Sequence, residues 1–380
     1  NLNNSERVEV WKTIQNSDNA KCSIILGARS SIFLPFENLG LIIIDEEHDT
    51  SYKQQQPSPR YHSRDAAIYL ANLHKAKVLL GSATPSIETY YNAQNGKYGF
   101  VELLKRYADI KLPKINAIDI SMAFKKKQMQ SFLSNDLINE IQKHLDRNKQ
   151  IILFQNRRGY SKVLSCKSCG NAECCKYCSV SLTYHKINNN LRCHYCGYIK
   201  EIPKLCSSCS DSSLEMKGYG TEQICELLET IFPEHKIQRM DHDTTRKKNA
   251  YEEIIQDFQA LKIDILVGTQ MIAKGFDFEN VSLVGIVDSD SMLNFPDFRS
   301  HERAFQLMSQ VAGRAGRKNK QGSVYLQTSN PDHEIIRQVS SHSYINFYNI
   351  QLKERKSFNY PPFCKLIILK FKHTDYHILD

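Results

Sequence analysis

The chain has 380 residues, which is enough for two or three domains with apolar cores. Its 41% hydrophobic and 24% charged residues are typical of a globular protein, and its net charge of +9 weakly favours a polyanionic partner. No apolar run approaches the roughly 20 residues of a membrane span, and the polar start is not a signal peptide. We therefore expect no membrane contact, and the paired cysteines described below favour the reducing cytoplasm.

The first hundred residues alternate short apolar runs with polar turns. Strands are predicted at 24–26, 41–44 and 78–80, and a helix near 65–75. Such alternation is typical of a parallel sheet built from strand–helix–strand units. The less regular residues 96–133 look like a connector.

The second part repeats this pattern around a cysteine-rich segment at about 165–210. A helix capped by Asn135 should place Leu137, Ile138, Ile141 and Leu145 on one stripe, before a strand at 151–154. Helices are then predicted at 222–231, 248–260 and 300–315, and strands at 236–240, 263–267, 282–287 and 323–328. Residues 343–380, with a strand-like 366–369, look like the opening of another domain. The sequence thus predicts two α/β lobes, with a metal module inserted in the second.

Eight of the twelve cysteines form four Cys-x-x-Cys pairs within 44 residues. Each such turn presents two thiolates to one metal ion, and two turns complete a tetrahedral Zn²⁺ site. The loop between the inner pairs has about the usual ribbon length, so the inner pairs should share one ion and the outer pairs a second. Expected ligands are Cys166, Cys169, Cys206 and Cys209 for one Zn²⁺, and Cys175, Cys178, Cys193 and Cys196 for the other. Disulfides are less compatible with the cytoplasm, Cys174 is a spare thiol, and His185 and His194 are less favoured ligands.

The apolar run 41–44 leads directly into Asp45, Glu46, Glu47 and His48. A strand so short and apolar should be buried on both faces, and acids at its end would lie at the carboxyl edge of the sheet, where α/β proteins bind ligands. In a nucleotide-driven motor, Asp45 would hold Mg²⁺ and Glu46 would polarise the attacking water. An acidic loop that only keeps the strand end soluble is equally compatible with these residues alone.

Gln310, Arg314 and Arg317 are spaced i, i+4 and i+7. If the helix at 300–315 continues that far, all three lie on one face, where two guanidiniums and an amide suit a γ-phosphate. The alternative is a solvated basic helix end. The glycines beside the arginines favour the phosphate site, because they let another backbone or a phosphate come close.

Two further segments carry groups suited to DNA. The turn after the strand at 263–267 offers hydroxyl, amide and basic side chains to a phosphodiester backbone, while Asp277 would face the nucleotide. The loop 52–62 mixes aromatic, basic and amide side chains, and aromatic faces stack on unpaired bases. Plain turn chemistry and a solvated loop are the alternatives. The expected DNA contacts from these segments are Lys53, Arg60, Tyr61, Thr269, Gln270 and Lys274.

The motifs occur in a recognisable order: Gly-Ala-Arg-Ser (27–30), Asp-Glu-Glu-His (45–48), Gly-Ser-Ala-Thr-Pro-Ser (81–86), Asn-Arg-Arg-Gly-Tyr (156–160), the eight cysteines, Gly-Thr-Gln-Met-Ile-Ala-Lys-Gly-Phe-Asp-Phe (268–278) and Gln-Val-Ala-Gly-Arg-Ala-Gly-Arg (310–317). This set resembles the primosomal protein N-prime (PriA) family, bacterial superfamily-2 helicases of replication restart. The resemblance implies two RecA-like helicase lobes, each a parallel sheet flanked by helices. It also implies ATP-driven 3′-to-5′ DNA unwinding at stalled forks, with primosome proteins and single-stranded-DNA-binding protein as partners.

By matching positions, the resemblance implies that Asp45 and Glu46 act on Mg²⁺ and water and that Arg314 and Arg317 are arginine fingers. The implied cofactors are ATP with Mg²⁺ and two Zn²⁺. Further nucleotide contacts are expected from Glu47, His48, Gln310, Gly275 and Asp277, and further DNA contacts from Arg157 and Arg158. Tyr160, Thr221 and Glu222 lie in family-like stretches without an assigned chemistry.

The implied organisation is the C-terminal part of lobe 1 at 1–108, a connector and the start of lobe 2 at 109–164, the zinc insert at 165–211, the rest of lobe 2 at 212–342 and the start of a truncated C-terminal domain at 343–380. The family's Gly-x-x-x-x-Gly-Lys-Thr phosphate loop does not occur, since the only Gly-Lys pair, Gly96-Lys97, is followed by Tyr98. We therefore expect a fragment that hydrolyses ATP poorly alone. Two other functions stay open: a zinc-bearing DNA-binding scaffold with a vestigial motor, and a translocase that moves on duplex DNA without separating its strands.

Overall fold

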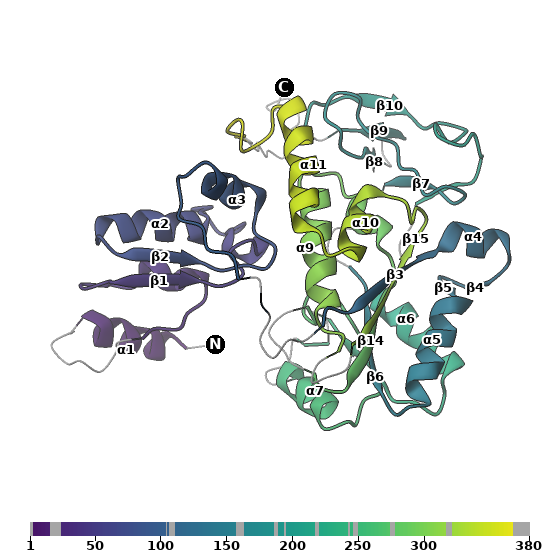
Figure 1. Ribbon diagram of the computed structural model, residues 1–380, viewed down its shortest axis with the longest axis horizontal. Helices are drawn as coiled ribbons and strands as arrows, with labels where there is room; N and C mark the ends of the chain where they lie inside the picture. Colours follow the sequence, from purple (N-terminus) through teal and green to yellow (C-terminus); the bar gives the residue numbers. More distant parts are fainter. Residues whose placement is uncertain are drawn as a thin grey trace. The chain divides into compact units, whose positions relative to one another are not determined.

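The computed structural model describes residues 3–15, 24–103, 105, 111–156, 163–185, 189–193, 195–216, 220–241, 244–245, 250–273, 278–316 and 321–367, without the side chains of 215 and 216. The chain divides into two compact units, Asn1–Gly99 and Phe100–Asp380 (Figure 1). Among the described residues, no helix combines the length and the apolar character needed to cross a bilayer.

The first unit contains two parallel strands, β1 (Leu41–Ile44) and β2 (Lys77–Leu80). The chain between them forms α2 (Ser63–Leu73), which packs on both strands and buries Ala67 and Ala71. α3 (Ile87–Gln94) follows β2. α1 (Asn4–Gln15) and two short 3-10 helices, η1 (Arg29–Phe33) and η2 (Thr50–Tyr52), complete the unit.

Two predictions for the first unit are corrected. Residues 24–26 form no strand, and Ile24 and Leu26 are 83% and 96% exposed, because no described strand pairs with them. The strand at 41–44 is confirmed, but it is not buried on both faces. Leu41 and Ile43 are 53% and 63% exposed, since in the described part of the chain this sheet has only β1 and β2 and α2 packs against the alternate residues.

The second unit is built on a six-stranded parallel sheet with the order β12-β13-β6-β14-β15-β3. The strands are β3 (Lys114–Asp119), β6 (Gln150–Phe154), β12 (Ile237–Met240), β13 (Ile265–Gly268), β14 (Val281–Ile286) and β15 (Ser323–Thr328). β3 lies inside the predicted connector 96–133, which is therefore wrong at this point. Its partner β15 is about 200 residues away in the sequence, so the residues near β3 did not indicate the strand with which it pairs.

Helices flank both faces of this sheet (Figure 1). α5 (Asn135–Leu145) and α6 (Thr221–Ile231) share one apolar core with Ile151, Leu153 and Val267. The stripe predicted for α5 is confirmed, although its N-cap is Ser134, whose Oγ accepts a hydrogen bond from Leu137 N at 3.2 Å, and not Asn135. α5 lies so close to the sheet that a Cβ on Gly285 would come within 3.3 Å of Leu137 and 2.5 Å of Leu153.

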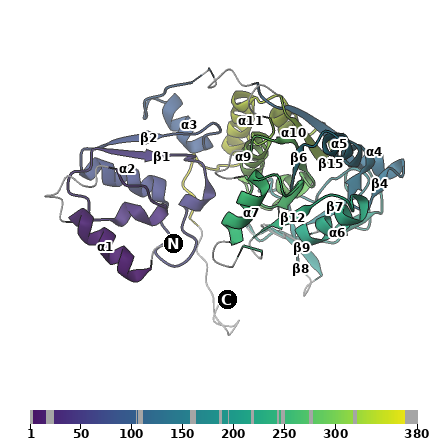
Figure 2. The same cartoon turned by 90° about the horizontal axis from the view of Figure 1, so that it is seen from below.

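The opposite face carries α9 (Ser300–Ala312), α10 (Glu334–Ser340) and α11 (Tyr344–Ser357), which lie side by side (Figure 2). Phe305 of α9 stacks on Phe347 of α11 with ring centroids 4.2 Å apart. The shorter elements of the unit are α4 (Ile120–Lys125), α7 (Ala250–Gln259), α8 (Asp290–Leu293), β4 (Met129–Gln130) and β5 (Leu133–Ser134). Leu366 and Ile367 form no strand, and the domain boundaries at 108, 164, 211 and 342 stay predictions.

The cysteine-rich segment is inserted between β6 and α6. Its first and last strands, β7 (Leu164–Cys166) and β11 (Leu214–Met216), pair antiparallel, with Leu214 opposite Cys166. Between them β8 (Thr183–His185), β9 (Asn190–Arg192) and β10 (Ile199–Glu201) form a three-stranded antiparallel sheet. The segment thus leaves the six-stranded sheet and returns to it as a separate small module.

Candidate functional site

The eight paired cysteines come together as two clusters. Within each cluster, one ligand sulfur from every cysteine lies within 4.8 Å of the others, and the two sets are Cys166, Cys169, Cys206 and Cys209, and Cys175, Cys178, Cys193 and Cys196. Close Sγ–Sγ distances are 3.6 Å for Cys166 and Cys209 and 3.5 Å for Cys175 and Cys196. Sulfurs at about 2.3 Å from a tetrahedral Zn²⁺ would be about 3.8 Å apart. The donor set and its spacing therefore fit zinc, and the grouping is the one expected from loop length.

The four Cys-x-x-Cys turns share one backbone geometry. In each, the residue after the second cysteine donates its N–H to the carbonyl of the first, at distances between 2.8 and 3.2 Å. That residue has a positive φ every time: Gly170 (71°), Ser179 (50°), Gly197 (75°) and Ser210 (58°). Glycine adopts this conformation without strain, whereas serine does not. The two serines show that the turn itself, with its paired thiols, imposes the conformation.

The thiols of each cluster differ in acidity. A backbone donor at Tyr198 is the main cause that lowers the pKa of Cys196 to about 7. Burial opposes ionisation of Cys206, but backbone donors at Cys209 and Ser208 outweigh it and lower its pKa to about 7. Burial raises the pKa of Cys169 to about 12. Zinc binds the ionised thiolate, so binding of a divalent cation would ionise the thiols of each cluster.

Aromatic residues attach the inner cluster to the helices of the second unit. Phe298 stacks on Tyr360 with centroids 4.5 Å apart, and Tyr195 of the inner cluster meets both rings edge-on. Next to them, Arg355 Nη2 lies 2.6 Å from Glu302 Oε2, and these side chains are 2% and 4% exposed. The zinc module is therefore fixed to the lobe through a buried patch and not only through its two ends.

The predicted acidic strand end forms a tight turn after β1. Glu46 has a positive φ of 47°, and its N–H donates to Asp45 Oδ1 at 3.0 Å. Glu47 is 1% exposed and accepts hydrogen bonds from Ser86 N at 2.6 Å and Thr89 Oγ1 at 2.9 Å. His48 Nδ1 lies 2.7 Å from Ser82 Oγ. The acidic run and the turn at 81–86 are thus joined by side-chain contacts, with Asp45 and Glu46 on the open side.

The loop 52–62 folds back on itself beside this turn. Lys53 Nζ donates to Arg60 O at 2.8 Å, and Tyr61 packs edge-on against Phe33 with centroids 4.8 Å apart. Tyr52 donates its hydroxyl proton to Asp45 O at 2.7 Å, and burial, followed by the nearby carboxylates, raises the pKa of Tyr52. The predicted DNA loop is therefore in direct contact with the predicted magnesium ligand's backbone.

The second unit gathers further predicted residues at the carboxyl ends of its strands. Thr269 is 8% exposed, and Gln270 Nε2 lies 3.5 Å from Asn156 Oδ1. Arg314 donates from Nη2 to Ala273 O at 2.6 Å. The helix predicted at 300–315 is shorter than expected, so the condition for placing Gln310 and Arg314 on one helical face is not met. α9 ends at Ala312 with Gly313 as C-cap, and Arg314 N bonds Val311 O in a tighter turn.

Several predicted site residues lie outside the described part of the chain, so their positions are not part of this account. They are Arg157, Arg158, Lys274, Gly275, Asp277 and Arg317, together with Tyr160 and the alternative ligand His194.

Sequence reasoning missed two features of these sites. Arg64 contacts the acidic turn, but it is 17 residues from Glu47 and belongs to no motif. Thr221 starts α6 and donates its hydroxyl proton to Asp241 Oδ2 at 2.6 Å, with both side chains buried. Only the family-like stretch around Thr221 gave a signal, and it carried no chemistry.

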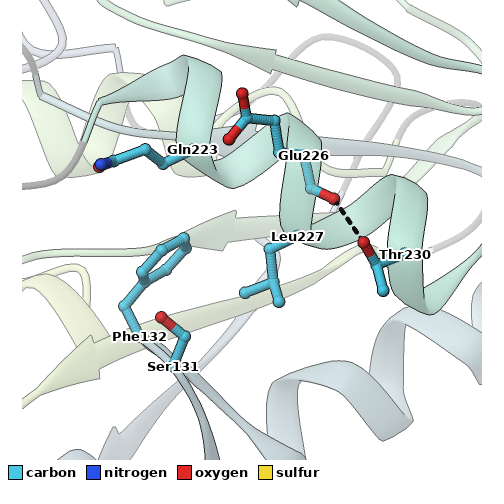
Figure 3. Close-up of a pocket in the computed structure, with 6 residues that line it drawn as sticks. All are labelled: Ser131, Phe132, Gln223, Glu226, Leu227 and Thr230. Carbon is cyan, nitrogen blue, oxygen red and sulfur yellow. Dashed lines mark hydrogen bonds between the residues drawn. The ribbon is translucent and has the colours of Figure 1, made fainter.

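A cavity of about 420 Å³ lies away from all predicted site residues (Figure 3). Gln223, Glu226, Leu227 and Thr230 of α6 line one side, and the turn between β4 and β5 lines the other with Ser131 and Phe132. It is open and mixed in polarity, and none of the residues that line it belongs to the two cysteine clusters.

Two parts of this chain match known family models. Residues 209–319 match the helicase conserved C-terminal domain, and residues 175–200, with the inner cysteine cluster, match the PriA DNA helicase Cys-rich region domain. Among solved structures, RecG bound to a three-way DNA junction aligns over 93% of this chain and 35% of its own (TM-score 0.48, 14% identity). S. cerevisiae Dbp5 bound to RNA and ADP BeF3 aligns over 84% of this chain and 63% of its own (TM-score 0.40, 12% identity).

The chain is also similar to several proteins named replication restart protein PriA. It is 41% identical to that of Bacillus subtilis over 98% of this chain and 46% of the relative. It is 45% identical to that of Haemophilus influenzae over 99% and 50%, and 45% identical to that of Rickettsia felis over 91% and 53%. The chain spans about half the length of these relatives.

The parallel sheet of the second unit, its helicase C-terminal domain and its two thiolate clusters define a helicase-type α/β lobe with a zinc-binding insert. Within this class, the match to the PriA Cys-rich region domain and the 41–45% identity to PriA proteins along nearly the whole chain indicate one family. The chain belongs to the PriA family.

Proposed function

We propose that this chain is the motor and zinc-binding region of an ATP-dependent 3′-to-5′ DNA helicase that restarts replication at stalled forks. The observation that carries the proposal is the 45% identity over 99% of the chain to a replication restart protein PriA. The described geometry supports it, because the acidic turn after β1 and the turn after β13 both lie at the carboxyl ends of parallel strands, where α/β proteins bind ligands.

In this proposal, ATP and Mg²⁺ bind at the acidic turn. Asp45 would hold the ion, Glu46 would polarise the attacking water, and Arg314 and Arg317 would stabilise the charge that develops on the transferred phosphoryl group. The nucleotide site would also include Glu47, and His48, Gln310, Gly275 and Asp277 would supply further nucleotide contacts. Because Glu47 is buried in hydrogen bonds to Ser86 and Thr89, its contribution would be to hold the turn in place.

Forked or single-stranded DNA would contact the loop 52–62 and the strand ends of the second unit. Lys53, Arg60, Arg157, Arg158 and Lys274 would meet phosphates, Tyr61 would stack on a base, and Thr269 and Gln270 would bond the backbone. The contact of Tyr52 with the Asp45 carbonyl gives the DNA loop a route to the hydrolytic residues. Primosome proteins and single-stranded-DNA-binding protein are the proposed partners, and the bacterial cytoplasm is the proposed location.

The test measures ATP hydrolysis and strand displacement on forked DNA with the protein as its gene encodes it. We expect DNA-stimulated hydrolysis and displacement from a 3′ tail, and we expect Glu46→Gln to abolish both while ATP still binds. ATP-driven movement without displacement would indicate a duplex translocase. DNA binding without hydrolysis would indicate a zinc-bearing scaffold. Residues 1–380 alone should hydrolyse ATP poorly.

A further inference from the structure

Arg64 is a cation that no motif assigns, and it lies against the acidic turn. It is the second residue of α2, and its side chain is 13% exposed. Its Nη1 lies 2.8 Å from Glu47 Oε2, 2.8 Å from Ser86 Oγ and 3.2 Å from Thr89 Oγ1. One guanidinium therefore joins the turn after β1 to the first turn of α3.

The partner of Arg64 is almost entirely removed from water. Glu47 is 1% exposed, Ser86 N donates to its Oε1 at 2.6 Å, and its own N–H donates to Gly81 O at 3.0 Å. A buried carboxylate is stable only with a hydrogen-bonded countercharge. Burial alone would lower the pKa of Arg64, but the carboxylates of Asp65 and Glu47 raise it, so the cation persists.

The residue before Glu47 is the one whose backbone is strained. Glu46 has a φ of 47°, a region that non-glycine residues avoid. Such a conformation persists only where the surrounding structure fixes it on both sides. On one side Asp45 Oδ1 accepts from Glu46 N at 3.0 Å. On the other side the fixed point is the Glu47 side chain, held by Arg64, Ser86 and Thr89.

We propose that Arg64 is a positioning residue for hydrolysis: by fixing Glu47, it keeps Glu46 in the left-handed conformation that aims its carboxylate at the attacking water. This inference rests on the proposed function, because it needs Glu46 to act on water. Arg64 acts here through its contacts with Glu47, Ser86 and Thr89. Without the guanidinium, Glu47 would turn toward water, and the turn that carries Glu46 would relax. A displacement of about 1 Å at a reacting group lowers a rate by roughly 100-fold.

The experiment compares ATP turnover in the protein as its gene encodes it, with saturating DNA. Arg64→Met should lower kcat by about 10- to 100-fold while the dissociation constant for ATP changes less than about twofold. Arg64→Lys should recover part of kcat, because it keeps the charge but not the planar geometry. Arg7→Met, on α1 and exposed, is the matched control and should leave kcat unchanged.

A second variant separates positioning from folding. In Arg64→Met with Glu47→Gln, no unpaired charge is buried, so thermal stability should return toward that of the wild type while kcat stays low. Recovery of kcat together with stability would overturn the inference, as would an unchanged kcat in Arg64→Met. A wild-type protein without DNA-stimulated hydrolysis would overturn the proposed function and with it the role of Arg64. Normal wild-type turnover matched by the variants would overturn the role of Arg64 alone.

Discussion

Tyr360, three residues past α11, donates a hydrogen bond from its hydroxyl to the main-chain carbonyl of Cys178, 2.9 Å away and 182 residues earlier in the chain. Its ring at the same time stacks on Phe298. A thiolate turn of the inner cluster is therefore fixed to the segment that follows α11. Metal binding and the packing of α11 should consequently affect each other.

Removing this one hydroxyl should weaken the second unit. Tyr360→Phe keeps the ring stack but leaves the Cys178 carbonyl without this donor, so we expect a loss of about 1 kcal/mol in the free energy of unfolding. Chemical denaturation measures it. Tyr69→Phe, on α2 and 66% exposed, is the control and should stay within about 0.5 kcal/mol of the wild type. Equal losses in both variants would argue against a stabilising role for the Tyr360 hydroxyl.

The number of bound Zn²⁺ ions should depend on how many of the two cysteine clusters are intact. The wild-type chain should hold two Zn²⁺, and Cys178→Ser should reduce the content to about one, since three thiolates bind zinc less tightly than four. Cys174→Ser removes a thiol that belongs to neither cluster and should leave the content unchanged. Metal analysis after gel filtration gives the numbers. A full complement of zinc in Cys178→Ser would contradict the assignment of the inner ligands.

Substitutions at two glycines of the thiolate turns would measure the cost of backbone strain and the cost of a steric clash separately. A Cβ on Gly197 would meet nothing within 4 Å, so Gly197→Ala should cost only the left-handed conformation, about 1–2 kcal/mol. A Cβ on Gly170 would lie 2.3 Å from Ser329 Cβ, so Gly170→Ala should cost more. Ser210→Gly relieves the same strain and should stabilise the chain slightly. Denaturation of the zinc-loaded chain ranks the three, and a harmless Gly197→Ala would refute the strain argument.

The stability of the second unit should depend on pH through His333. Burial, followed by the neighbouring His301, lowers the pKa of His333 to about 4 from an ordinary value of 6.5. Between these values the unfolded chain binds a proton that the folded chain does not, so stability falls as pH falls from about 6.5 toward 4. The shift corresponds to about 3 kcal/mol at most.

The control variant for this effect is His333→Asn, which removes the titrating imidazole but can still cap α10. His333 Nδ1 accepts a hydrogen bond from Ile335 N at the start of α10, and asparagine is also a good N-cap. His333→Asn should therefore lose less stability than the wild type between pH 7 and pH 4.5, because the carboxylates titrate in both proteins. Denaturant unfolding of both proteins at pH 7 and pH 4.5 measures this difference. An identical pH dependence of the free energy of unfolding would show that His333 does not titrate as proposed.

The sequence predicted those parts of the structure whose determinants are local. The stripe on α5 and the four Cys-x-x-Cys turns are each defined by residues within one turn or one loop. β3 was missed because Lys114–Asp119 is a strand only by virtue of pairing with β15, far away in the sequence. The end of α9 was misplaced because the spacing of Gln310 and Arg314 resembles a helix, whereas Gly313 ends it in practice.

The candidate sites show the same division. The acidic run at 45–48 was recognisable from its place after a strand, but the burial of Glu47 was not, because it depends on Arg64, Ser86 and Thr89 from later elements. The contact of Tyr360 with Cys178 likewise has no local signature. Long-range polar contacts of this kind follow from the packed structure and leave no periodic pattern in the sequence.

The pairing of β7 with β11 has a consequence for the history of the chain. The inserted residues begin with β7 and end with β11, which pair with each other. The outer cysteine cluster takes two thiols from the start of the insert and two from its end, so the insert is closed by contacts within itself. An insert closed in this way can be gained, lost or exchanged between related domains as one DNA segment, without a change in the six-stranded sheet.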